Sequence, residues 1–419
     1  MKKELVLIGA GKIGRGYMTY IADNAGYRIH YLDAYDPLVK GLREQGYYTM
    51  FVNSFENGKR DWTKRKITNF DIFCTQTEYE QCLEVLATAN LATAQIYAGA
   101  IEPIGKMVAD AIKLRVKRGF NEPLDIAFVV NFLYGEDMCK EVCMKNLDTQ
   151  EEKDYAEKYV GFVAGLVKGY GPTPSEAMLK EDPFAISCSD ADSLPVDVLQ
   201  MKGELPTDIN FVPAHYVTNL EKYKIWAGNV SHCAIAFFGK QRGYEKKVDA
   251  DLDPYVYKCQ LMCARESFTS LKKEVKVLDE ELHEHLPHLG PQSERGFDPD
   301  RVNREDPDTL NRIGADPIRK LGRNDRIVGP ALVAIKGGEM PFFLARAAAM
   351  GFYFINPNDK SACELQEYIK ENGIEKAIEK YCELDLNDKA EYNLYQLILG
   401  HYIEISSNDA VGYDYFRMK

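Results

Sequence analysis

Three features that would assign a protein to a special class are absent from this sequence. It contains no apolar run of about 18 residues, so it predicts no transmembrane helix. Its ten cysteines are scattered without a CxxC pair, which argues for buried, reduced thiols rather than a disulfide framework or a thiolate metal site. Positive charge is in deficit, with 52 Lys and Arg against 64 Asp and Glu. The net charge of -12 repels phosphate backbones, so nucleic acid is not an expected partner.

A secretion signal is missing as well. The start, MKKELVLIGAGKIG, has two lysines and an apolar run, but the run is short, contains glycines and lacks a small-residue cleavage site. Hydrophobic residues make up 45% and charged residues 28% of the 419 residues, as in ordinary globular proteins. We therefore expect a cytoplasmic protein, a monomer or small homo-oligomer, that binds a small-molecule substrate and neither membrane nor nucleic acid.

Strand-like and helix-like segments alternate through the first half of the chain. Short apolar and β-branched runs suit buried strands, and the segments between them have amphipathic helical spacing. The expected strands are Glu4–Gly9, Tyr27–Asp33, Tyr47–Val52, Ala92–Tyr97 and Leu124–Val130, and the expected helices are Lys12–Asn24, Pro37–Glu44, Gln81–Ala89 and Pro103–Lys117. Such alternation predicts βαβ units and a mostly parallel sheet.

Helical patterns dominate from about residue 200 onward. The expected long helices are Val217–Phe238, Pro254–Lys273, Ala331–Met350 and Ala390–Ile405. The predicted fold is therefore α/β, with an N-terminal Rossmann-type domain of mostly parallel sheet at 1–195 and a mainly α-helical domain at 196–419. The segment His285–Asp308 is rich in Pro, Gly and charge and predicts a long surface loop.

The motif Gly9-x-Gly11-x-x-Gly14 follows the first expected strand and opens the first expected helix. The first glycine permits a tight turn, the second lets the backbone approach a pyrophosphate, and the third allows close packing of helix on strand. The N–H groups of this turn, which also includes Lys12 and Ile13, point toward the expected diphosphate. This context predicts a dinucleotide site rather than a structural glycine turn.

Asp33 ends the second expected strand, about 20 residues beyond the glycines. A carboxylate at this place accepts hydrogen bonds from the ribose hydroxyls of the adenosine half and repels a 2′-phosphate. Ala34 and Tyr35 supply no replacement cation, so NAD is preferred over NADP. FAD is the main competing cofactor, and the residues described next argue against it.

The stretch LEKYKIWAGNVSH, residues 220–232, carries the candidate catalytic groups Lys224, Asn229 and His232. Burial lowers the pKa of a lysine toward that of a general base, and an asparagine amide donates to a developing alkoxide. On one α-helix a spacing of five turns the face by about 140°, so we expect Gly228 to bend the segment. The alternative is an ordinary polar helix with a solvated lysine.

Four blocks, in the order GAGKIGRG, VVNFLYGE (129–136), Lys224-x4-Asn229-x2-His232 and RIGADPIRKLGRNDRIVGPA (312–331), resemble the polyol-specific long-chain dehydrogenase family. The resemblance covers most of the chain and implies metal-independent, NAD-dependent oxidation of a secondary alcohol. It implies Lys224 as the base, Asn131 and Asn229 as donors to the reacting oxygen, and His232 as their support.

The same resemblance implies that Arg312 and Lys320 lie in the substrate pocket, and that the reaction interconverts mannitol 1-phosphate and fructose 6-phosphate. Two alternatives remain open: a sibling dehydrogenase acting on an unphosphorylated polyol or a hexuronate of the mannonate or altronate type, and a nucleotide-binding protein without turnover. Tyr223 stands where the family usually has an arginine before the lysine, and His285–Asp308 resembles an insertion relative to shorter members. Both departures affect the expected shape of the substrate pocket, so the choice of substrate stays open.

The segment from residue 312 to 326 has a local charge of +3 in this acidic chain. Guanidinium groups there suit a sugar phosphate, and intramolecular ion pairs are the alternative. Its charged residues are Arg312, Asp316, Arg319, Lys320, Arg323, Asp325 and Arg326. A further triplet, His283, His285 and His288, is more typical of a solvated helix end than of a metal site, and we expect no metal.

Overall fold

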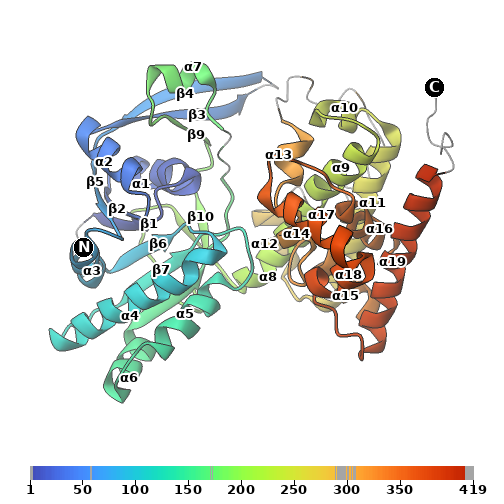
Figure 1. The fold of residues 1–419 in the computed structure, drawn as a ribbon. Helices are drawn as coiled ribbons and strands as arrows, with labels where there is room; N and C mark the ends of the chain where they lie inside the picture. Colours follow the sequence, from blue (N-terminus) through green and yellow to red (C-terminus); the bar gives the residue numbers. More distant parts are fainter. Residues whose placement is uncertain are drawn as a thin grey trace. The chain divides into compact units, whose positions relative to one another are not determined.

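The computed structural model describes residues 3–56, 59–169, 173–287 and 308–410, together with residues 171, 289, 299, 302 and 304. The chain divides into two compact units, Met1–Thr218 and Asn219–Lys419, drawn in Figure 1. Strands β10 (Leu194–Asp197) and β11 (Phe211–Ala214) pair with each other inside the first unit. This division falls at residue 218, whereas the sequence analysis placed the boundary at residue 195.

The first unit is built on a six-stranded parallel sheet in the order β5-β2-β1-β6-β7-β8. Numbered along the chain within this sheet, the strands run 3-2-1-4-5-6, the arrangement of dinucleotide-binding domains. The strands are β1 (Glu4–Ile8), β2 (Arg28–Asp33), β5 (Phe70–Cys74), β6 (Leu91–Ala94), β7 (Leu124–Phe128) and β8 (Val160–Ala164). The predicted fold class is confirmed, and the second unit is mainly helical.

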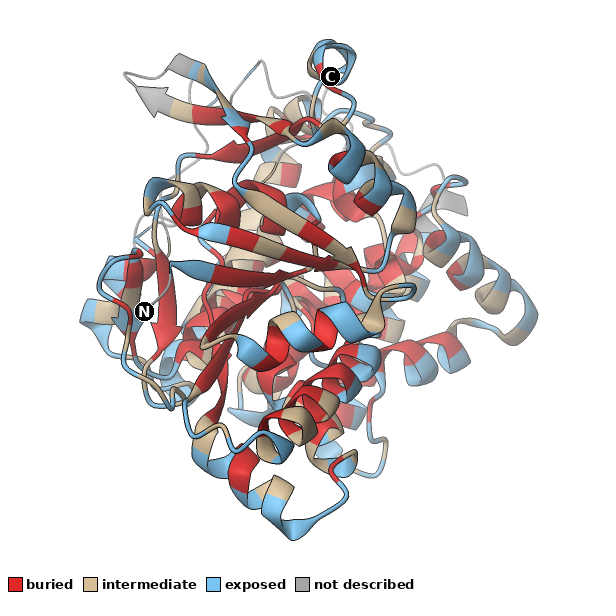
Figure 2. Cartoon of the chain, turned by 90° about the vertical axis from the view of Figure 1, so that its left-hand side faces the viewer, coloured by how far each residue is buried: buried red, intermediate tan, exposed pale blue. Residues whose placement is uncertain are grey.

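Both faces of this sheet are buried, which explains its nearly continuous apolar strands. Alternate side chains of β1 belong to different cores: Leu5 and Leu7 pack on one side, and Val6 and Ile8 on the other. Strands β6, β7 and β8 are buried along their whole length, whereas β2 and β5 also contain partly buried residues. Figure 2 accordingly shows strands in red together with tan and pale blue segments. The helices that cover the sheet are α1 (Thr19–Asn24) and α2 (Asp36–Gln45) on the first side, and α3 (Tyr79–Thr88), α4 (Ile101–Lys117), α5 (Gly135–Lys145) and α6 (Gln150–Tyr159) on the second.

A separate three-stranded sheet contains β3 (Tyr48–Glu56), antiparallel to β4 (Lys59–Ile67) and parallel to β9 (Ile186–Ser189). The strand expected at Tyr47–Val52 is therefore present but lies outside the parallel sheet. Strand β4 has the sequence KRDWTKRKI, whose charges hide any apolar alternation, so sequence reasoning missed it.

The second unit packs its helices around one apolar core. Helix α11 (Pro254–Glu274) packs against α9 (Asn229–Gln241) and α15 (Val328–Lys336), and Asp253 caps its first turn by accepting from the Tyr255 and Val256 N–H groups. Its other helices include α8 (Val217–Lys222, which starts in the first unit), α12 (Asp279–His285), α13 (Leu310–Gly314), α14 (Pro317–Leu321), α16 (Phe342–Phe352), α17 (Lys360–Asn372), α18 (Ile374–Cys382) and α19 (Lys389–Ala410).

The single helix expected over Ala331–Met350 is wrong, because α15 and α16 are separate. Gly338 takes a left-handed φ of 81°, and Pro341 precedes the first residue of α16. The loop expected at His285–Asp308 lies mostly outside the described residues, as does His288. No helix in the described part of the chain combines the length and the apolar character needed to cross a membrane.

The ten cysteines are all free thiols, and Cys363 is the exposed one. Burial raises the pKa of the thiols in both i,i+4 pairs, so they behave as small core side chains. These pairs are Cys139 with Cys143 and Cys259 with Cys263.

Candidate active site

The glycine-rich turn has the geometry that its sequence predicts. Gly9 has φ 102°, and its N–H donates to Leu32 O at 2.8 Å. A Cβ on Gly14 would lie 2.0 Å from Gly9 O, so only glycine fits there. A Cβ on Gly11 would meet no atom within 4 Å, because this position faces open space. The turn is therefore packed at its first and third glycines and accessible at its second, as a pyrophosphate requires.

Asp33 lies at the end of β2, directly beside this turn. Its Oδ2 accepts from Ala10 N at 2.7 Å, and its Oδ1 accepts from Tyr35 N at 2.8 Å. The two backbone donors fix the carboxylate at the carboxyl edge of the sheet, and each oxygen retains a second lone pair. This arrangement fits an acceptor for ribose hydroxyls.

Gln95, which sequence reasoning missed, lines the turn from the end of β6. Its N–H donates to Ile8 O at 2.8 Å, and its side-chain Nε2 donates to Thr93 Oγ1 at 2.5 Å. Its Oε1 is buried without a hydrogen-bond partner and would lie 3.4 Å from a Cβ on Gly14. A buried polar atom without a hydrogen-bond partner is typical of a site where water or a ligand supplies the missing hydrogen bond.

Arg15 is a second residue that the motif did not reveal. It is 8% exposed; its Nε donates to Ala10 O at 2.7 Å, and its Nη1 donates to Phe184 O at 2.6 Å. The Tyr48 hydroxyl donates to Arg15 O at 2.7 Å. Arg15 therefore ties the glycine-rich turn to the three-stranded sheet through contacts that are distant in sequence.

The remaining predicted residues of the first unit lie along the same edge of the sheet. Lys12 Nζ donates to Thr173 Oγ1 at 2.8 Å, and Ile13 is half-buried at the start of η1 (Ile13–Met18). Asn131 is exposed in the segment that follows β7, before α5 begins at Gly135. The carboxyl ends of parallel strands are where such folds bind their ligands.

In the second unit, Lys224 and Asn229 share one face of a helix. A π-helical turn, η3 (Tyr223–Gly228), joins α8 to α9, and the Asn229 N–H donates to Lys224 O. Because this turn bonds residues five apart, the two side chains lie one above the other. The sequence predicted that a bend at Gly228 would bring these two side chains together. The π-turn, which is wider than an α-helical turn, brings them to one face instead. His232 follows Asn229 by three residues and shares its side of α9.

The environment of Lys224 lowers its pKa to about 8, chiefly because the ammonium group is removed from water. The negative charge of Glu221 opposes this shift, and the positive charge of Arg326 reinforces it. Burial, with the positive charge of Lys247 as the next cause, also lowers the pKa of His232. Lysine is therefore the group in this cluster that changes protonation near neutral pH.

Tyr223, the departure from the family pattern, points into the core of the second unit. It is fully buried, its hydroxyl donates to Val275 O at 3.1 Å, and its ring meets Phe268 edge-on with centroids 5.8 Å apart. Burial raises the pKa of this hydroxyl to about 12. The side chain therefore anchors η3 to α11.

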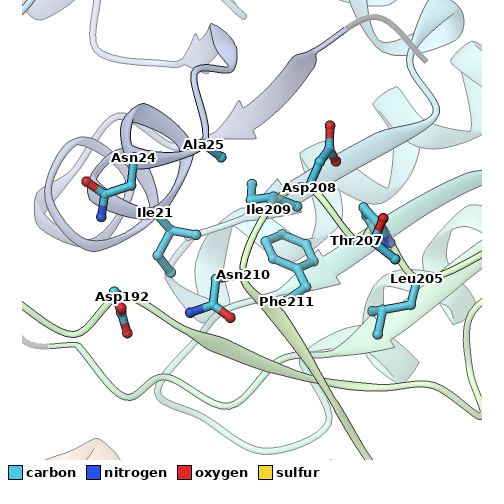
Figure 3. Close-up of a pocket in the computed structure, with 11 residues that line it drawn as sticks. Ile21, Asn24, Ala25, Asp192, Leu205, Thr207, Asp208, Ile209, Asn210 and Phe211 are labelled. Atoms are coloured by element: carbon cyan, nitrogen blue, oxygen red, sulfur yellow. The ribbon is translucent and has the colours of Figure 1, made fainter.

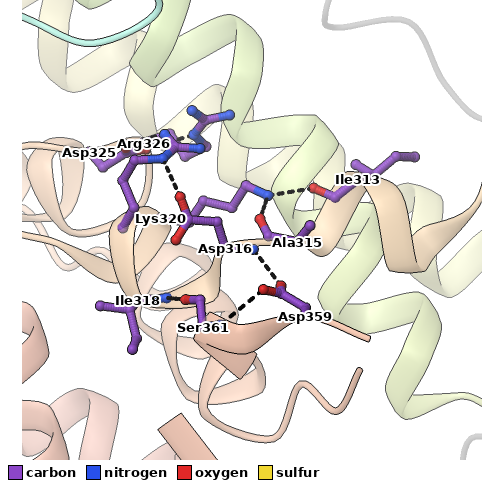
Figure 4. A network of polar contacts seen from close by, with 10 residues as sticks. Ile313, Ala315, Asp316, Ile318, Lys320, Asp325, Arg326, Asp359 and Ser361 are labelled. Carbon is purple, nitrogen blue, oxygen red and sulfur yellow. Dashed lines mark hydrogen bonds and ion pairs between the residues drawn. The ribbon is translucent and has the colours of Figure 1, made fainter. Parts of the chain in front are cut away.

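Most of the cationic segment 312–326 is engaged within the protein, as Figure 4 shows around Lys320. Lys320 is 5% exposed and donates to the carbonyls of Ile313 and Ala315, and burial lowers its pKa to about 8. Arg312 is exposed and forms a two-point ion pair with Asp308. Both predicted substrate residues thus have structural partners in this structure.

The next two arginines of the segment also form ion pairs. Arg319 contacts Asp316 at 2.7 Å and Asp325 at 2.9 Å. Arg323 binds both oxygens of buried Glu391, at 2.5 and 2.6 Å. These contacts favour the ion-pair interpretation for Arg319 and Arg323.

A hollow of about 510 Å³ on the first unit is distinct from the glycine-rich turn. Its lining combines polar and apolar side chains, among them Ile21, Asn24, Asp192, Asn210 and Phe211, which Figure 3 labels. Asn24 ends α1, whereas the glycine-rich turn precedes the helical segment that leads into α1. The hollow therefore lies at the other end of this segment and is not the dinucleotide site. Within the described residues no cluster of three or more His, Cys, Asp or Glu side chains suits a metal ion.

Comparison with known proteins supports the family that these residues suggest. Residues 3–207 match the Mannitol dehydrogenase Rossmann domain. Mannitol-1-phosphate 5-dehydrogenase of Lacticaseibacillus casei (strain BL23) is 27% identical over 372 residues, covering 88% of this chain and 92% of the relative. The protein of that name from Buchnera aphidicola subsp. Acyrthosiphon pisum (strain APS) is 26% identical over 391 residues, covering 92% and 95%.

Solved structures agree on the fold. The ternary complex of Pseudomonas fluorescens mannitol 2-dehydrogenase with NAD and D-mannitol has a TM-score of 0.74 at 15% identity, covering 97% of this chain and 92% of that chain. A substrate-free D-sorbitol dehydrogenase has a TM-score of 0.68 at 16% identity, covering 96% and 93%. The matched domain and these relatives support a polyol dehydrogenase family for this chain.

Proposed function

We propose that this chain interconverts mannitol 1-phosphate and fructose 6-phosphate with NAD, using Lys224 as general base and no metal. The class is secure: the chain is an NAD-dependent polyol dehydrogenase. The relatives named mannitol-1-phosphate 5-dehydrogenase support the substrate. The π-turn that places Lys224 and Asn229 on one helix face, with the Lys224 pKa near 8, carries the mechanism.

In the first unit, the chain's own groups bind and orient the cofactor. The open face at Gly11 admits the pyrophosphate, and Asp33 accepts from the ribose hydroxyls. Asp33 also disfavours a 2′-phosphate by charge repulsion, which supports NAD over NADP. NAD supplies the hydride acceptor for the secondary alcohol.

In the second unit, Lys224 takes the hydroxyl proton as the carbon loses hydride. Asn229 donates its amide N–H to the oxygen on which negative charge develops, and His232 supports that arrangement. In the reverse direction the Lys224 ammonium group returns the proton to the ketose oxygen. The resemblance to the family implies Asn131 as a further donor to the reacting oxygen.

A second candidate substrate is an unphosphorylated polyol or a hexuronate. The ion pairs of Arg312, Arg319 and Arg323 favour the uncharged polyol of these two, because these side chains are already neutralised by carboxylates. Steady-state assays of NADH formation with mannitol 1-phosphate, mannitol, mannonate and altronate distinguish the candidates. No turnover of any phosphorylated polyol would overturn the proposed substrate.

Substitution of the proposed base tests the chemistry separately. Lys224→Ala is expected to lower kcat by roughly 100- to 10,000-fold, because the proton transfer loses its base. NAD affinity, measured by equilibrium titration, stays within a few-fold of wild type. Lys222→Ala, two residues earlier, is the matched control and keeps normal turnover. An unaffected kcat in Lys224→Ala would remove Lys224 from the mechanism.

The pKa of Lys224 sets the direction of the pH dependence. Oxidation needs the neutral amine, so its kcat/KM rises with pH and levels off above about 8. Reduction needs the ammonium group, so its kcat/KM falls as pH rises through the same range. Rate profiles in both directions between pH 6 and 10 measure this; a midpoint near the ordinary lysine value of 10.5 would contradict it.

A further inference from the structure

Arg326 differs from the other arginines of the segment 312–326. Its Nε and its backbone N–H both donate to Asp325 Oδ1, at 2.6 and 2.7 Å. The two terminal Nη atoms of Arg326 have no hydrogen bond in the described part of the chain. They are also not among the fully buried polar atoms that lack a hydrogen-bond partner. A guanidinium group that is only 11% exposed thus presents two unused donors.

Neighbouring contacts hold Arg326 near the catalytic turn. The Trp226 indole Nε1 donates to Asn324 O at 3.2 Å, and a Cβ on Gly329 would lie 2.7 Å from the same indole ring. The residues on both sides of Arg326 therefore pack on η3, two positions from Lys224. Asp325 is fixed in turn by Arg319, whose Nη1 donates to its Oδ2 at 2.9 Å.

The other cations of the segment cannot offer a comparable pair of donors without breaking contacts. Arg312 binds Asp308, and Arg323 binds Glu391 through both Nη atoms. Lys320 directs its ammonium group to two backbone carbonyls. Arg326 is thus the arginine of this segment whose terminal fork stays open.

We propose that Arg326 binds the anionic end of the substrate, a phosphate monoester, through its two Nη atoms. A planar guanidinium fork matches two oxygens of a phosphate, and its fixed Nε lowers the entropy lost on binding. The inference rests on the proposed function, because it assigns a binding residue to the phosphate group that distinguishes mannitol 1-phosphate from mannitol. It also explains how a chain of charge -12 attracts an anion locally.

The charge of Arg326 acts on the base as well. Glu221 on the same helical segment raises the pKa of Lys224, and Arg326 from the facing segment lowers it. Loss of the Arg326 charge is therefore expected to move the pH midpoint of oxidation upward. A lysine at this position removes the guanidinium fork but keeps the positive charge, so the pH midpoint of oxidation is expected to stay unchanged.

The test compares Arg326→Lys and Arg326→Gln with Arg323→Lys, a control three residues earlier that keeps its charge beside Glu391. Kinetics are measured with mannitol 1-phosphate and mannitol. Arg326→Lys is expected to raise KM for mannitol 1-phosphate by roughly 10- to 100-fold, with kcat within a few-fold and with little change toward mannitol. Arg326→Gln raises KM similarly and also shifts the pH midpoint upward. Arg323→Lys changes none of these values.

Two results overturn the inference while leaving the proposed function intact: an unchanged KM for mannitol 1-phosphate in both Arg326 variants, or an equal loss toward both substrates. If the wild-type protein turns over no phosphorylated polyol, the proposed substrate fails instead. Arg326 is then tested with inorganic phosphate as a competitive inhibitor. Weaker inhibition of Arg326→Lys than of wild type supports the anion site, and equal inhibition excludes it.

Discussion

At the residue scale, motif spacing predicts candidate groups that depend on near neighbours and misses those that depend on distant contacts. The glycines, Asp33 and Lys224 were proposed from sequence, because turn chemistry and the family pattern depend on near neighbours. Arg15 was missed because its partner Phe184 lies 169 residues away. Arg326 was seen only as one charge in a cluster, since its open fork depends on which carboxylates its neighbours bind.

Asp33 gives the first prediction at this scale. Asp33→Ala is expected to weaken NAD binding by roughly 10- to 100-fold, because a charged acceptor of ribose hydroxyls is lost. Affinity for NADP is expected to fall less or to rise, since repulsion of the 2′-phosphate disappears. Dissociation constants for both cofactors, measured by fluorescence titration, give the comparison.

The conservative variant Asp33→Asn separates charge from structure. It retains an oxygen that can accept from Tyr35 N or Ala10 N and removes the negative charge. We expect it to relax the discrimination against NADP while the protein stays folded. Equal losses for NAD and NADP in both variants would contradict a ribose role for Asp33.

At the element scale, strands and helices with clear apolar periodicity were predicted, and those without it were not. β1 and β7 are buried on both faces and have mostly apolar sequences. β4 was missed because its residues are mostly charged. The π-turn η3 was not predicted either, because no amino-acid composition is typical of a single extra residue in a helix. The spacing of five between Lys224 and Asn229 was the sequence signal that could have indicated it.

The π-turn makes a prediction of its own. Inserting one alanine after Gly228 adds one residue between Lys224 and Asn229. Asn229 is then expected to turn about 100° around the helix axis relative to Lys224. We expect kcat to fall by about 100-fold or more, because the donor no longer faces the reacting oxygen.

Secondary structure and cofactor binding serve as controls for that insertion. Far-UV circular dichroism and the NAD dissociation constant are expected to stay close to wild type, since the dinucleotide site belongs to the first unit. An insertion variant that is folded and turns over normally would show that the shared face of Lys224 and Asn229 is not required.

At the scale of the whole molecule, composition predicted no transmembrane helix but could not locate the ligands. A net charge of -12 is unfavourable for the binding of anions. We propose that position resolves this: backbone N–H groups of the glycine-rich turn would bind one anion, and the guanidinium group of Arg326 would bind another. The change from alternating strands and helices to helices alone predicted two domains, whereas the division at residue 218 lies inside α8, where no change of composition marks it.

The acid stability of the second unit gives the last prediction. Glu391 on α19 is 2% exposed; it accepts from Arg323, from Lys336 at 2.6 Å and from Asp385 N at 2.8 Å. These partners, Arg323 first, lower its pKa from 4.5 to about 2. Because the folded-state pKa is lower, the carboxylate stabilises the fold fully above pH 4.5, and this contribution is lost as pH falls from about 4.5 to about 2.

Glu391→Gln is expected to lower the free energy of unfolding by up to about 3 kcal/mol at pH 7 and by much less near pH 2. The two tryptophans, Trp62 and Trp226, lie one in each unit. A Trp62→Phe background leaves Trp226 as the reporter of the second unit, and urea titrations at pH 7, 4 and 2.5 follow its fluorescence. A difference between the Glu391→Gln variant and its parent that stays constant with pH would mean that the carboxylate acts by shape alone, because only a charge with a depressed pKa loses its effect on acidification.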